Sequence, residues 1–391
     1  MSGAAAAEAL FWAGALFILY TWFGYPLLMA GWARARPRPV RRGRGHQPTM
    51  TAVVAARNEA AGIAARARNL LEQDYPTELL DIVLVSDGST DATAEIIQAL
   101  AAAEPRVRAI VLPENVGKAA ALNAAVEQAR GEVLLFADAR QRFERNVAAM
   151  LAENFADPAV GSATGELMIE RGGGVAEQVG LYWRYEKWIR RNEAASGSML
   201  GATGAIYAMR RELWRPLERG ALLDDFLAPM RAVLAGARAV FDERAIAWDR
   251  PSERSEQEFR RKLRTLAGNY QAFALEPGLL LPWRNPTWLR VWSHKVFRLL
   301  APYGLVLVFG GALFAPGGFY GALAVLQGVF YGLGLAGIAA ERRGRPVRSR
   351  VVRLAATFIV LHAAAVGGLW VWLRGGSAAG LWRKAYQENE G

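Results

Sequence analysis

The stretch Val133-Leu134-Leu135-Phe136-Ala137-Asp138-Ala139-Arg140 decides the fold. Five apolar residues in a row, bounded by charged residues, are typical of a buried strand in a parallel sheet. The run stops at the carboxylate of Asp138, and open α/β sheets bind their ligands at the carboxyl ends of their strands. Alternatively, Asp138 only caps the helix that follows. The residues around this strand decide between the two interpretations.

Strands and helices alternate on both sides of this stretch. We expect strands at 51–56, 82–86 and 107–112, and helices at 60–73, 92–102 and 119–129. Such strand–helix–strand units predict parallel strands joined by right-handed crossovers. Further strands are expected at 160–168, 201–207, 239–241 and 245–248, with helices at 175–191, from Asp224 onward, and at 253–273.

Composition indicates a globular domain joined to membrane helices. The chain has 391 residues, of which 53% are hydrophobic, and a net charge of +11. The basic residues cluster beside apolar runs, as in membrane proteins, which argues against a nucleic-acid partner. The chain has no cysteine and three histidines, so a disulfide framework and a zinc site are not expected.

Four segments are long and apolar enough to span a bilayer. They are 10–32, two spans within 299–340 divided at Ala315-Pro316-Gly317-Gly318, and 354–373. A cleaved signal peptide would need basic residues before the first run, where only Glu8 stands. The basic segments 34–44 and 341–353 instead predict a cytoplasmic side after the first and third spans.

These features predict six parts of the chain. We expect a membrane helix at 1–33, a basic linker at 34–48, a globular domain at 49–275, a region with an interfacial helix at 276–298, three membrane helices at 299–373 and a tail at 374–391. The interfacial helix is predicted from Trp283, Trp288, Trp292 and Lys295, which suit a membrane surface.

Several carboxylates are expected near one edge of the sheet. Asp87 and Asp138 end strands, and Asp224-Asp225 opens a helix. Like charges that converge raise each other's pKa, so a bound cation or a general-base role would explain such a cluster. Asp224 and Asp225 could instead complement the dipole of their own helix.

A series of motifs resembles the family 2 glycosyltransferases, which include cellulose, hyaluronan and poly-N-acetylglucosamine synthases. The motifs are residues 53–59, 85–91, 115–123, the opening strand, 204–207 and 223–226, and the resemblance covers about 49–271. It implies a GT-A-like, Rossmann-type mixed α/β sheet domain in the cytoplasm, with one N-terminal and three C-terminal transmembrane helices. It also implies a nucleotide-diphosphate-sugar donor.

The resemblance assigns donor-binding residues. Ala55, Glu59 and Asp87 would line the base pocket, and Asp87 can accept a hydrogen bond from the uracil N–H of a UDP-sugar. Lys118 would lie near the uracil or the phosphates, although it could also be a solvated residue at a helix start. Arg264 would contact the diphosphate, unless it belongs to a solvated helix face.

Asp138 corresponds to the first carboxylate of the family's Asp-x-Asp metal motif. Mg²⁺ and Mn²⁺ prefer oxygen ligands, so either ion would suit this position. Arg140 stands where the second Asp is expected. We hypothesise that Arg140 pairs with the donor diphosphate, as a guanidinium fork can.

The acidic pair matches the family's base motif. Asp225, with Asp224 as the alternative, would take the proton from the acceptor hydroxyl while that oxygen displaces the diphosphate with inversion. Gly204, Tyr207 and Trp183 are the expected acceptor contacts. The family's Gln-x-x-Arg-Trp motif is altered here to Arg261-Lys262-Leu263-Arg264-Thr265, which leaves processive synthesis open.

The sequence thus predicts an inverting enzyme of the bacterial inner membrane, with its catalytic domain in the cytoplasm. It would transfer sugar to a polysaccharide or glycolipid of the cell envelope. One alternative is transfer of a single sugar to a polyprenyl phosphate or other lipid. Another is a catalytically degraded membrane subunit. Four spans are few for an export channel, so a partner membrane subunit is possible.

Overall fold

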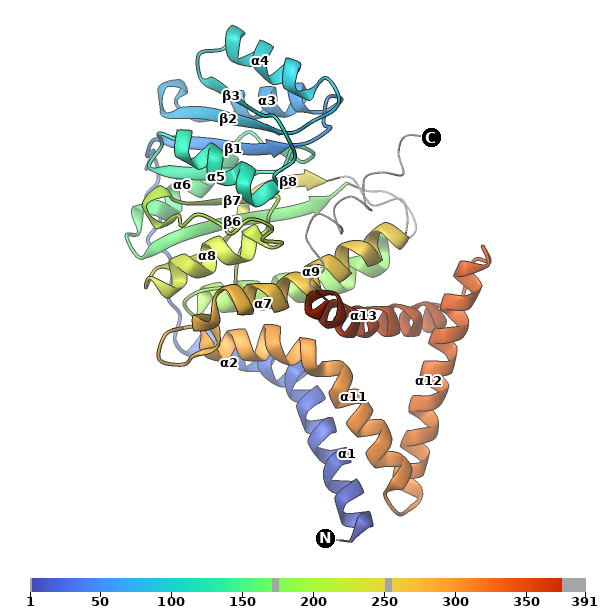
Figure 1. Cartoon of the computed structure of the whole chain (residues 1–391). Helices are drawn as coiled ribbons and strands as arrows, with labels where there is room; N and C mark the ends of the chain where they lie inside the picture. The colour runs from blue at the N-terminus through green and yellow to red at the C-terminus, as the bar shows by residue number, and fades with distance from the viewer. Residues whose placement is uncertain (1, 171–175, 250–254, 375–391) are drawn as a thin grey trace. The chain divides into compact units, whose positions relative to one another are not determined.

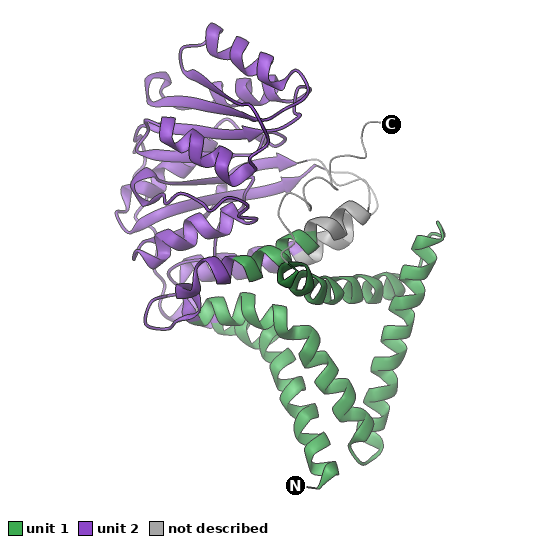
Figure 2. Cartoon of the chain, in the orientation of Figure 1, with its two compact units in different colours: residues 1–28, 254–271, 289–376 green, residues 29–253, 272–288, 377–391 purple. Residues whose placement is uncertain are grey.

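The computed structural model of the chain describes residues 2–170, 176–249 and 255–374, without the side chains of 176–182 and 255–261. The chain divides into two compact units (Figure 2). Unit 1 comprises 1–28, 254–271 and 289–376, and unit 2 comprises 29–253, 272–288 and 377–391. Most of the predicted tail, 375–391, lies outside the described residues.

Unit 2 is built on one mixed sheet (Figure 1). The described strands are β1 Met50–Ala56, β2 Leu80–Asp87, β3 Val107–Leu112, β4 Val133–Ala137, β5 Arg142–Phe143, β6 Val160–Ile169, β7 Ile206–Arg210 and β8 Arg238–Asp249. Their order is β3-β2-β1-β4-β7-β6-β8-β5. The first four strands in this order are parallel, β7 is antiparallel to β4 and β6, and β8 is parallel to β6 but antiparallel to β5.

Helices follow the strands as the alternating pattern predicts. The helices of this unit are α3 Ile63–Leu71, α4 Thr93–Ala103, α5 Lys118–Gln128, α6 Val147–Glu153, α7 Ala176–Ala195 and α8 Asp224–Leu234. The core packs α3, α4 and α6 against the sheet through residues such as Ile63, Ile97, Leu151 and Leu135. Every residue of β4 is buried. Full burial of one Leu side chain such as Leu135 contributes about 1.5–3 kcal/mol.

Three predicted strands differ most from the strands of the structure. β3 and β4 match the expectation, but the strand expected at 201–207 begins only at Ile206. Gly201 turns the chain with a φ of +73°, and Thr203 makes only an isolated bridge to Ile206. The short strands expected at 239–241 and 245–248 are one irregular strand, β8. The prediction lacked β5 and α6.

The predicted linker is packed on unit 2. Residues 36–48, here called the strap, follow α2 (Tyr25–Ala35). The Arg38 amide donates to the Ala195 carbonyl at 2.7 Å, and the Pro48 carbonyl accepts from the Tyr75 hydroxyl at 2.6 Å. A Cβ on Gly43 would lie 2.7 Å from the Ala156 Cβ. The backbone of the strap is therefore held at both ends and in the middle.

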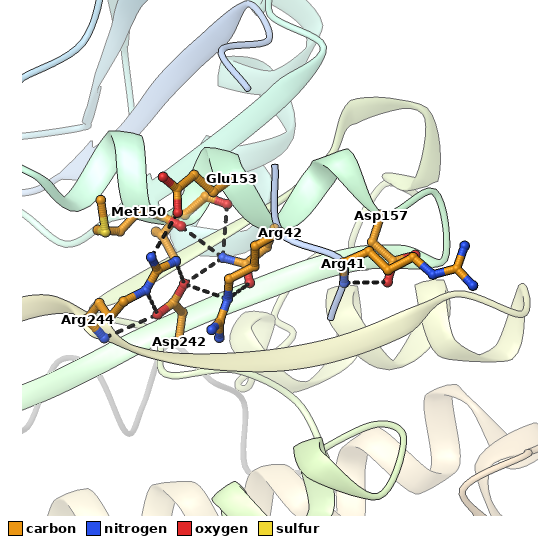
Figure 3. A network of polar contacts seen from close by, with 9 residues as sticks. Arg41, Arg42, Met150, Glu153, Asp157, Asp242 and Arg244 are labelled. Atoms are coloured by element: carbon orange, nitrogen blue, oxygen red, sulfur yellow. Dashed lines mark hydrogen bonds and ion pairs between the residues drawn. The ribbon is translucent and has the colours of Figure 1, made fainter. Parts of the chain in front are cut away.

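Ion pairs hold the strap beside α6 and β8 (Figure 3). Arg42 Nε lies 3.1 Å from Asn154 Oδ1 and 3.4 Å from a carboxylate oxygen of Asp242, which is fully buried. The Arg244 guanidinium donates two hydrogen bonds to Asp242, at 2.7 and 2.9 Å, and one to Glu153 at 2.8 Å. Burial raises the pKa of Asp242, but hydrogen bonds from Arg244 and Asn154 outweigh it and hold that pKa below its usual value.

Within the described residues, four helices are long and apolar enough to cross a membrane, as expected. They are Gly3–Ala35, Trp288–Phe314, α12 Gly318–Arg342 and α13 Arg350–Leu373. The first comprises α1 Gly3–Leu19, a π-helical turn at 20–24 and α2. The second comprises α10 Trp288–Arg290, a π-helical segment at 291–296 and α11 Phe297–Phe314. A further helix, α9, spans Ser255–Leu275.

Small residues let the helices of unit 1 approach closely. A Cβ on Gly14 of α1 would lie 2.8 Å from the Gly304 carbonyl of α11. Likewise, a Cβ on Gly334 of α12 would lie 2.7 Å from the Ala355 carbonyl of α13. The predicted break at 315–318 separates α11 from α12.

The region 276–298 differs from the expectation of a separate interfacial helix. One continuous helix runs from Trp288 to Phe314. The reason is local, because no glycine or proline interrupts the chain between Trp288 and Ala301. Trp288, Trp292 and Lys295 therefore belong to the helix of the second candidate span.

Candidate active site

The loops after β1 and β2 are tied together at the carboxyl edge of the sheet. The Thr90 amide donates to Asn58 Oδ1 at 2.8 Å, and the Asn58 amide donates to Ser89 Oγ at 3.2 Å. Asn58 has a φ of +54°, a conformation that asparagine tolerates better than most residues. The Glu59 amide also donates to Thr93 Oγ1 at 2.8 Å. These bonds fix the backbone at two of the predicted donor-binding motifs.

Asp87 holds the turn that precedes α5. Its carboxylate accepts from the amides of Val116 and Gly117 at 2.8 and 3.0 Å. Gly88 allows this approach, because a Cβ there would lie 2.3 Å from the Asn115 nitrogen. Gly117 has a φ of +91°. The geometry gives Asp87 a structural role at the carboxyl edge of the sheet. Its contact with a nucleotide base stays a prediction, as does that of Ala55.

Lys118 joins two of the predicted carboxylates. Its ammonium nitrogen lies 2.9 Å from Asp138 Oδ1 and 3.2 Å from Asp224 Oδ2. The three residues come from the start of α5, the end of β4 and the start of α8. Burial lowers the pKa of Lys118, but the two carboxylates outweigh it and hold that pKa above its ordinary value. Lys118 therefore stays charged at neutral pH and is not simply a solvated residue at a helix start.

Asp225 is oriented by the backbone beside it. Its Oδ2 accepts from the Gly204 amide at 2.9 Å, and its carbonyl accepts from the Ala202 amide at 2.7 Å. A Cβ on Gly204 would lie 2.9 Å from that carboxylate oxygen, so only glycine fits without a shift. Asp224 is buried and Asp225 is half-buried. Of the two carboxylates, Asp225 is the more accessible to an acceptor.

Tyr207 lies under the same carboxylates and is fully buried. Its ring stacks on Phe136, with 4.6 Å between centroids, and Phe136 also stacks on Trp214. The Tyr207 hydroxyl has no hydrogen-bond partner among the described residues. Burial, together with the charges of Asp224 and Asp225, raises the pKa of Tyr207 well above its usual value. The Tyr207 hydroxyl therefore stays protonated. The stacking on Phe136 blocks a contact between the Tyr207 ring and the acceptor substrate.

Arg140 pairs with a carboxylate that the sequence analysis missed. Arg140 Nη2 and Gln141 Nε2 both lie 3.0 Å from Asp249 Oδ2. Asp249 ends β8, and its only sequence signal is a carboxylate directly after the expected strand 245–248. Burial raises the pKa of nearby Glu59, and Arg140 opposes this effect while Asp138 adds to it. If Arg140 also pairs with a donor diphosphate, as predicted, its guanidinium would have to bind both the diphosphate and Asp249.

The donor groups at the site fit a divalent ion only in part. In the part of the chain that the structure describes, no three His, Cys, Asp or Glu side chains gather as metal ligands. Asp138 is 36% exposed and offers carboxylate oxygens, the donor type that Mg²⁺ and Mn²⁺ prefer. Asp138 therefore remains the candidate ligand.

Two predicted site residues, Trp183 and Arg264, lie on helices that contribute no residue to the Lys118–Asp138–Asp224 cluster. Trp183, on α7, lines a pocket with Lys187, Arg190 and Thr203. Arg264 lies on α9 in unit 1, and its contact with the diphosphate stays a prediction. The side chain of Arg261 lies outside the described residues.

Residues 51–216 match the family model described as Glycosyl transferase family 2. These residues are a family 2 glycosyltransferase domain. This match confirms the resemblance seen in the sequence motifs. It covers the strands that carry Asp87 and Asp138, the start of α5 with Lys118, and the loop that contains Gly204.

Relatives of the family 2 domain are named for different transferred sugars or products. An N-acetylglucosaminyltransferase of Rhizobium meliloti is 34% identical over 158 residues, which cover 40% of this chain and 36% of the relative. A beta-monoglucosyldiacylglycerol synthase of Nostoc is 32% identical, covering 35% and 30%. A poly-beta-1,6-N-acetyl-D-glucosamine synthase of Staphylococcus aureus is 25% identical, covering 51% and 49%. The chain thus spans about a third to a half of the length of these curated relatives.

One solved structure resembles nearly the whole chain. It is a mannosyltransferase from Pyrobaculum calidifontis in complex with GDP-Man and Mn²⁺. The TM-score is 0.72 at 22% identity, covering 94% of this chain and 99% of that one. At this identity the likeness shows the fold, which is a GT-A-like domain with mixed α/β sheet.

Proposed function

We propose that the chain transfers a sugar from a nucleotide-diphosphate sugar to a hydroxyl acceptor, with inversion at the anomeric carbon. The observation that carries the proposal is the half-buried Asp225 carboxylate, fixed by the Gly204 amide beside the Lys118–Asp138–Asp224 cluster. A general base needs such an ionised, oriented carboxylate within reach of the acceptor proton.

In the proposed reaction, the acceptor oxygen forms a bond to the anomeric carbon from the face opposite the diphosphate. The bond between that carbon and the diphosphate oxygen breaks, and the nucleoside diphosphate leaves with the bonding electrons. The acceptor proton passes to Asp225. Lys118 and Arg140 are the cations that offset the negative charge of the leaving group.

The donor is proposed to be a UDP-sugar, with Ala55, Glu59 and Asp87 around the base. The complex of the Pyrobaculum mannosyltransferase with GDP-Man and Mn²⁺ supports a nucleotide-diphosphate sugar and a divalent ion. Asp138 would hold Mg²⁺ or Mn²⁺, which would supply further positive charge at the diphosphate. Arg264 is proposed as an additional diphosphate contact.

The acceptor is proposed to be a polysaccharide or glycolipid of the cell envelope, at the cytoplasmic face of the inner membrane. Four helices able to cross a membrane and the basic segments that follow the first and third support this location. The names of the relatives include both a polymer synthase and a glycolipid synthase. Transfer of one sugar to a lipid therefore stands as the second candidate, with or without a partner membrane subunit.

The test uses the full chain in detergent with a panel of radiolabelled UDP- and GDP-sugars, with and without EDTA. We expect turnover with one UDP-sugar and a loss of about 10²- to 10⁴-fold in Asp225→Asn, with donor binding nearly intact. Product length on a gel separates a polymer from single transfer.

Two results would count against the proposal. If Asp225→Asn keeps its turnover, the base moves to Asp224, which Asp224→Asn then tests. If the wild-type chain turns over none of the donors, the chain is a non-catalytic membrane subunit.

A further inference from the structure

A pocket of unit 2 includes Thr203, the residue next to Gly204, whose amide holds the proposed base Asp225. It is lined mainly by Glu166 of β6, Trp183, Lys187 and Arg190 of α7, Thr203, and Phe241 of β8. Thr203 directly precedes Gly204, whose amide donates to Asp225 at 2.9 Å. The pocket is therefore adjacent to the loop that holds the proposed base.

The loop between the pocket and the base is rigid. The Thr203 amide donates to Thr164 Oγ1 at 3.0 Å, and the Thr164 hydroxyl donates to the Ile206 carbonyl at 2.7 Å. The Ile206 amide in turn donates to the Thr203 carbonyl at 2.8 Å. Since β6 and β7 fix Thr203 in this way, the pocket keeps its position relative to Asp225.

The residues that line the pocket carry more positive than negative charge. Lys187 forms an ion pair with Glu166. Arg190 is half-buried, and its Nη1 donates to the neutral Thr203 hydroxyl at 3.0 Å. Among the described residues, no carboxylate forms an ion pair with Arg190. The pocket therefore carries one positive charge in excess, on a guanidinium with further N–H donors.

The rest of the lining suits a mixed polar and apolar ligand. Trp183 and Phe241 supply aromatic surface next to the two cations. Aromatic side chains pack against sugar rings and hydrocarbon alike, whereas a guanidinium binds phosphate or carboxylate through two parallel hydrogen bonds. Both kinds of group would have to occur close together on the same ligand.

We propose that this pocket is the acceptor subsite and that Arg190 recognises an anionic group, phosphate or carboxylate, carried by the acceptor near its reacting end. Trp183 contacts the sugar or hydrocarbon next to that group. The inference rests on the proposed function, because it assigns the acceptor of the same reaction. It deepens that function from any hydroxyl acceptor to an acidic one.

The experiment compares three soluble acceptors with the full chain in detergent. Octyl β-glucoside 6-phosphate carries a phosphate, octyl β-glucuronide carries a carboxylate, and octyl β-glucoside is neutral. The variants are Arg190→Gln, Arg190→Lys and the matched control Arg191→Gln. Arg191 is the neighbouring residue, is 49% exposed and pairs with Glu243 outside the pocket lining.

We expect the wild-type chain to bind and use at least one anionic acceptor better than the glucoside. Arg190→Gln should weaken binding of that acceptor by about 10- to 100-fold, the range for a lost charged hydrogen bond. Its use of the glucoside should fall much less than its use of that anionic acceptor. Arg190→Lys should recover part of the loss, and Arg191→Gln should behave as wild type. The preferred anion separates a phosphate-bearing acceptor from a carboxylate-bearing one.

Equilibrium binding of all three acceptors is measured in parallel, so the result does not depend on turnover. The inference is overturned if neither anion binds more tightly than the glucoside, or if Arg190→Gln binds all three as wild type does. It is also overturned if Arg190→Gln weakens all three equally. A different result would contradict the proposed function alone. In that case no donor is turned over, although binding of the anionic acceptor still depends on Arg190.

Discussion

The ammonium nitrogen of Lys118 lies 2.9 Å from a carboxylate oxygen of Asp138. Without that cation, Asp138 and Asp224 would lie close together and repel both each other and the donor diphosphate. We therefore expect Lys118→Met to raise the KM for the nucleotide sugar by about 10- to 100-fold, with a smaller effect from Lys118→Arg.

A suitable control for Lys118→Met is Arg145→Met. It breaks an exposed ion pair with Asp74, in which the two side chains are 74% and 59% exposed, so it should leave the KM unchanged. A Lys118→Met chain with wild-type donor kinetics would show that the ammonium only stabilises the fold.

Arg140 gives the second prediction, which concerns the metal. Arg140→Asp would place a carboxylate close to Asp249, which now pairs with the guanidinium at 3.0 Å. Paired carboxylates bind divalent ions, so the variant should reach half-maximal activity at a lower Mn²⁺ concentration than the wild type. Its melting temperature in EDTA should fall, because the new charge has no partner.

Titration of activity with Mn²⁺, and melting with and without EDTA, measure these effects. Arg140→Gln removes the cation without adding an anion and serves as the control. If Arg140→Asp and the wild type give the same metal curve, position 140 has no part in binding the ion.

The buried hydroxyl of Tyr207 gives the third prediction. A buried hydroxyl without a hydrogen-bond partner costs about 1–3 kcal/mol. Tyr207→Phe removes that cost and keeps the stacking on Phe136, so the melting temperature should rise. If the hydroxyl donates to substrate, kcat/KM should fall about tenfold in the same variant.

Thermal melting and steady-state kinetics, measured on the same preparation, test the predicted stability and the predicted activity. Tyr207→Leu, which loses the stacked ring, should be less stable than the wild type. A Tyr207→Phe chain that gains stability and keeps full activity would exclude the hydroxyl from the reaction.

The fourth prediction is acid sensitivity at Asp242. Its pKa in the folded chain lies below the unfolded value of 3.8, so its contribution to stability is complete above that pH. The contribution is lost as the pH falls through the folded pKa. Asp242→Asn should therefore destabilise the chain at pH 7 by about 3–5 kcal/mol, since it leaves Arg244 and Arg42 without their buried partner.

Melting temperatures between pH 7 and pH 3 measure this effect, and the difference between variant and wild type should shrink below about pH 4. Asp74→Asn, at an exposed pair, is the control. A difference that stays constant down to pH 3 would contradict the assignment.

The residues of the candidate site were predictable because each follows a strong local signal. Asp138 ends an apolar run, Lys118 starts a helix after Gly117, and Asp224 opens a helix. What the sequence could not reveal was their contacts, such as Lys118 bridging Asp138 and Asp224 from three elements. The partner of Arg140 was also hidden, because Asp249 is 109 residues away and no local pattern links them.

The main differences between the predicted and the observed fold have similar causes. The strap reads as a linker from its Pro, Gly and Arg residues, since its buried partner Asp242 lies 200 positions further along. The strand expected from Gly201 begins only at Ile206, because Gly201 turns the chain with a positive φ where it lies close to Phe226. Local periodicity cannot anticipate either contact.

The strap also determines where the catalytic unit can be cut from its membrane helices. A fragment that begins at Thr49, where the sequence suggests a domain boundary, would lose Arg42 and Gly43 and expose the Asp242 side chain to water. A fragment that begins at Arg36 would retain them. Expressed side by side, the shorter fragment should be the one that aggregates and is digested by protease.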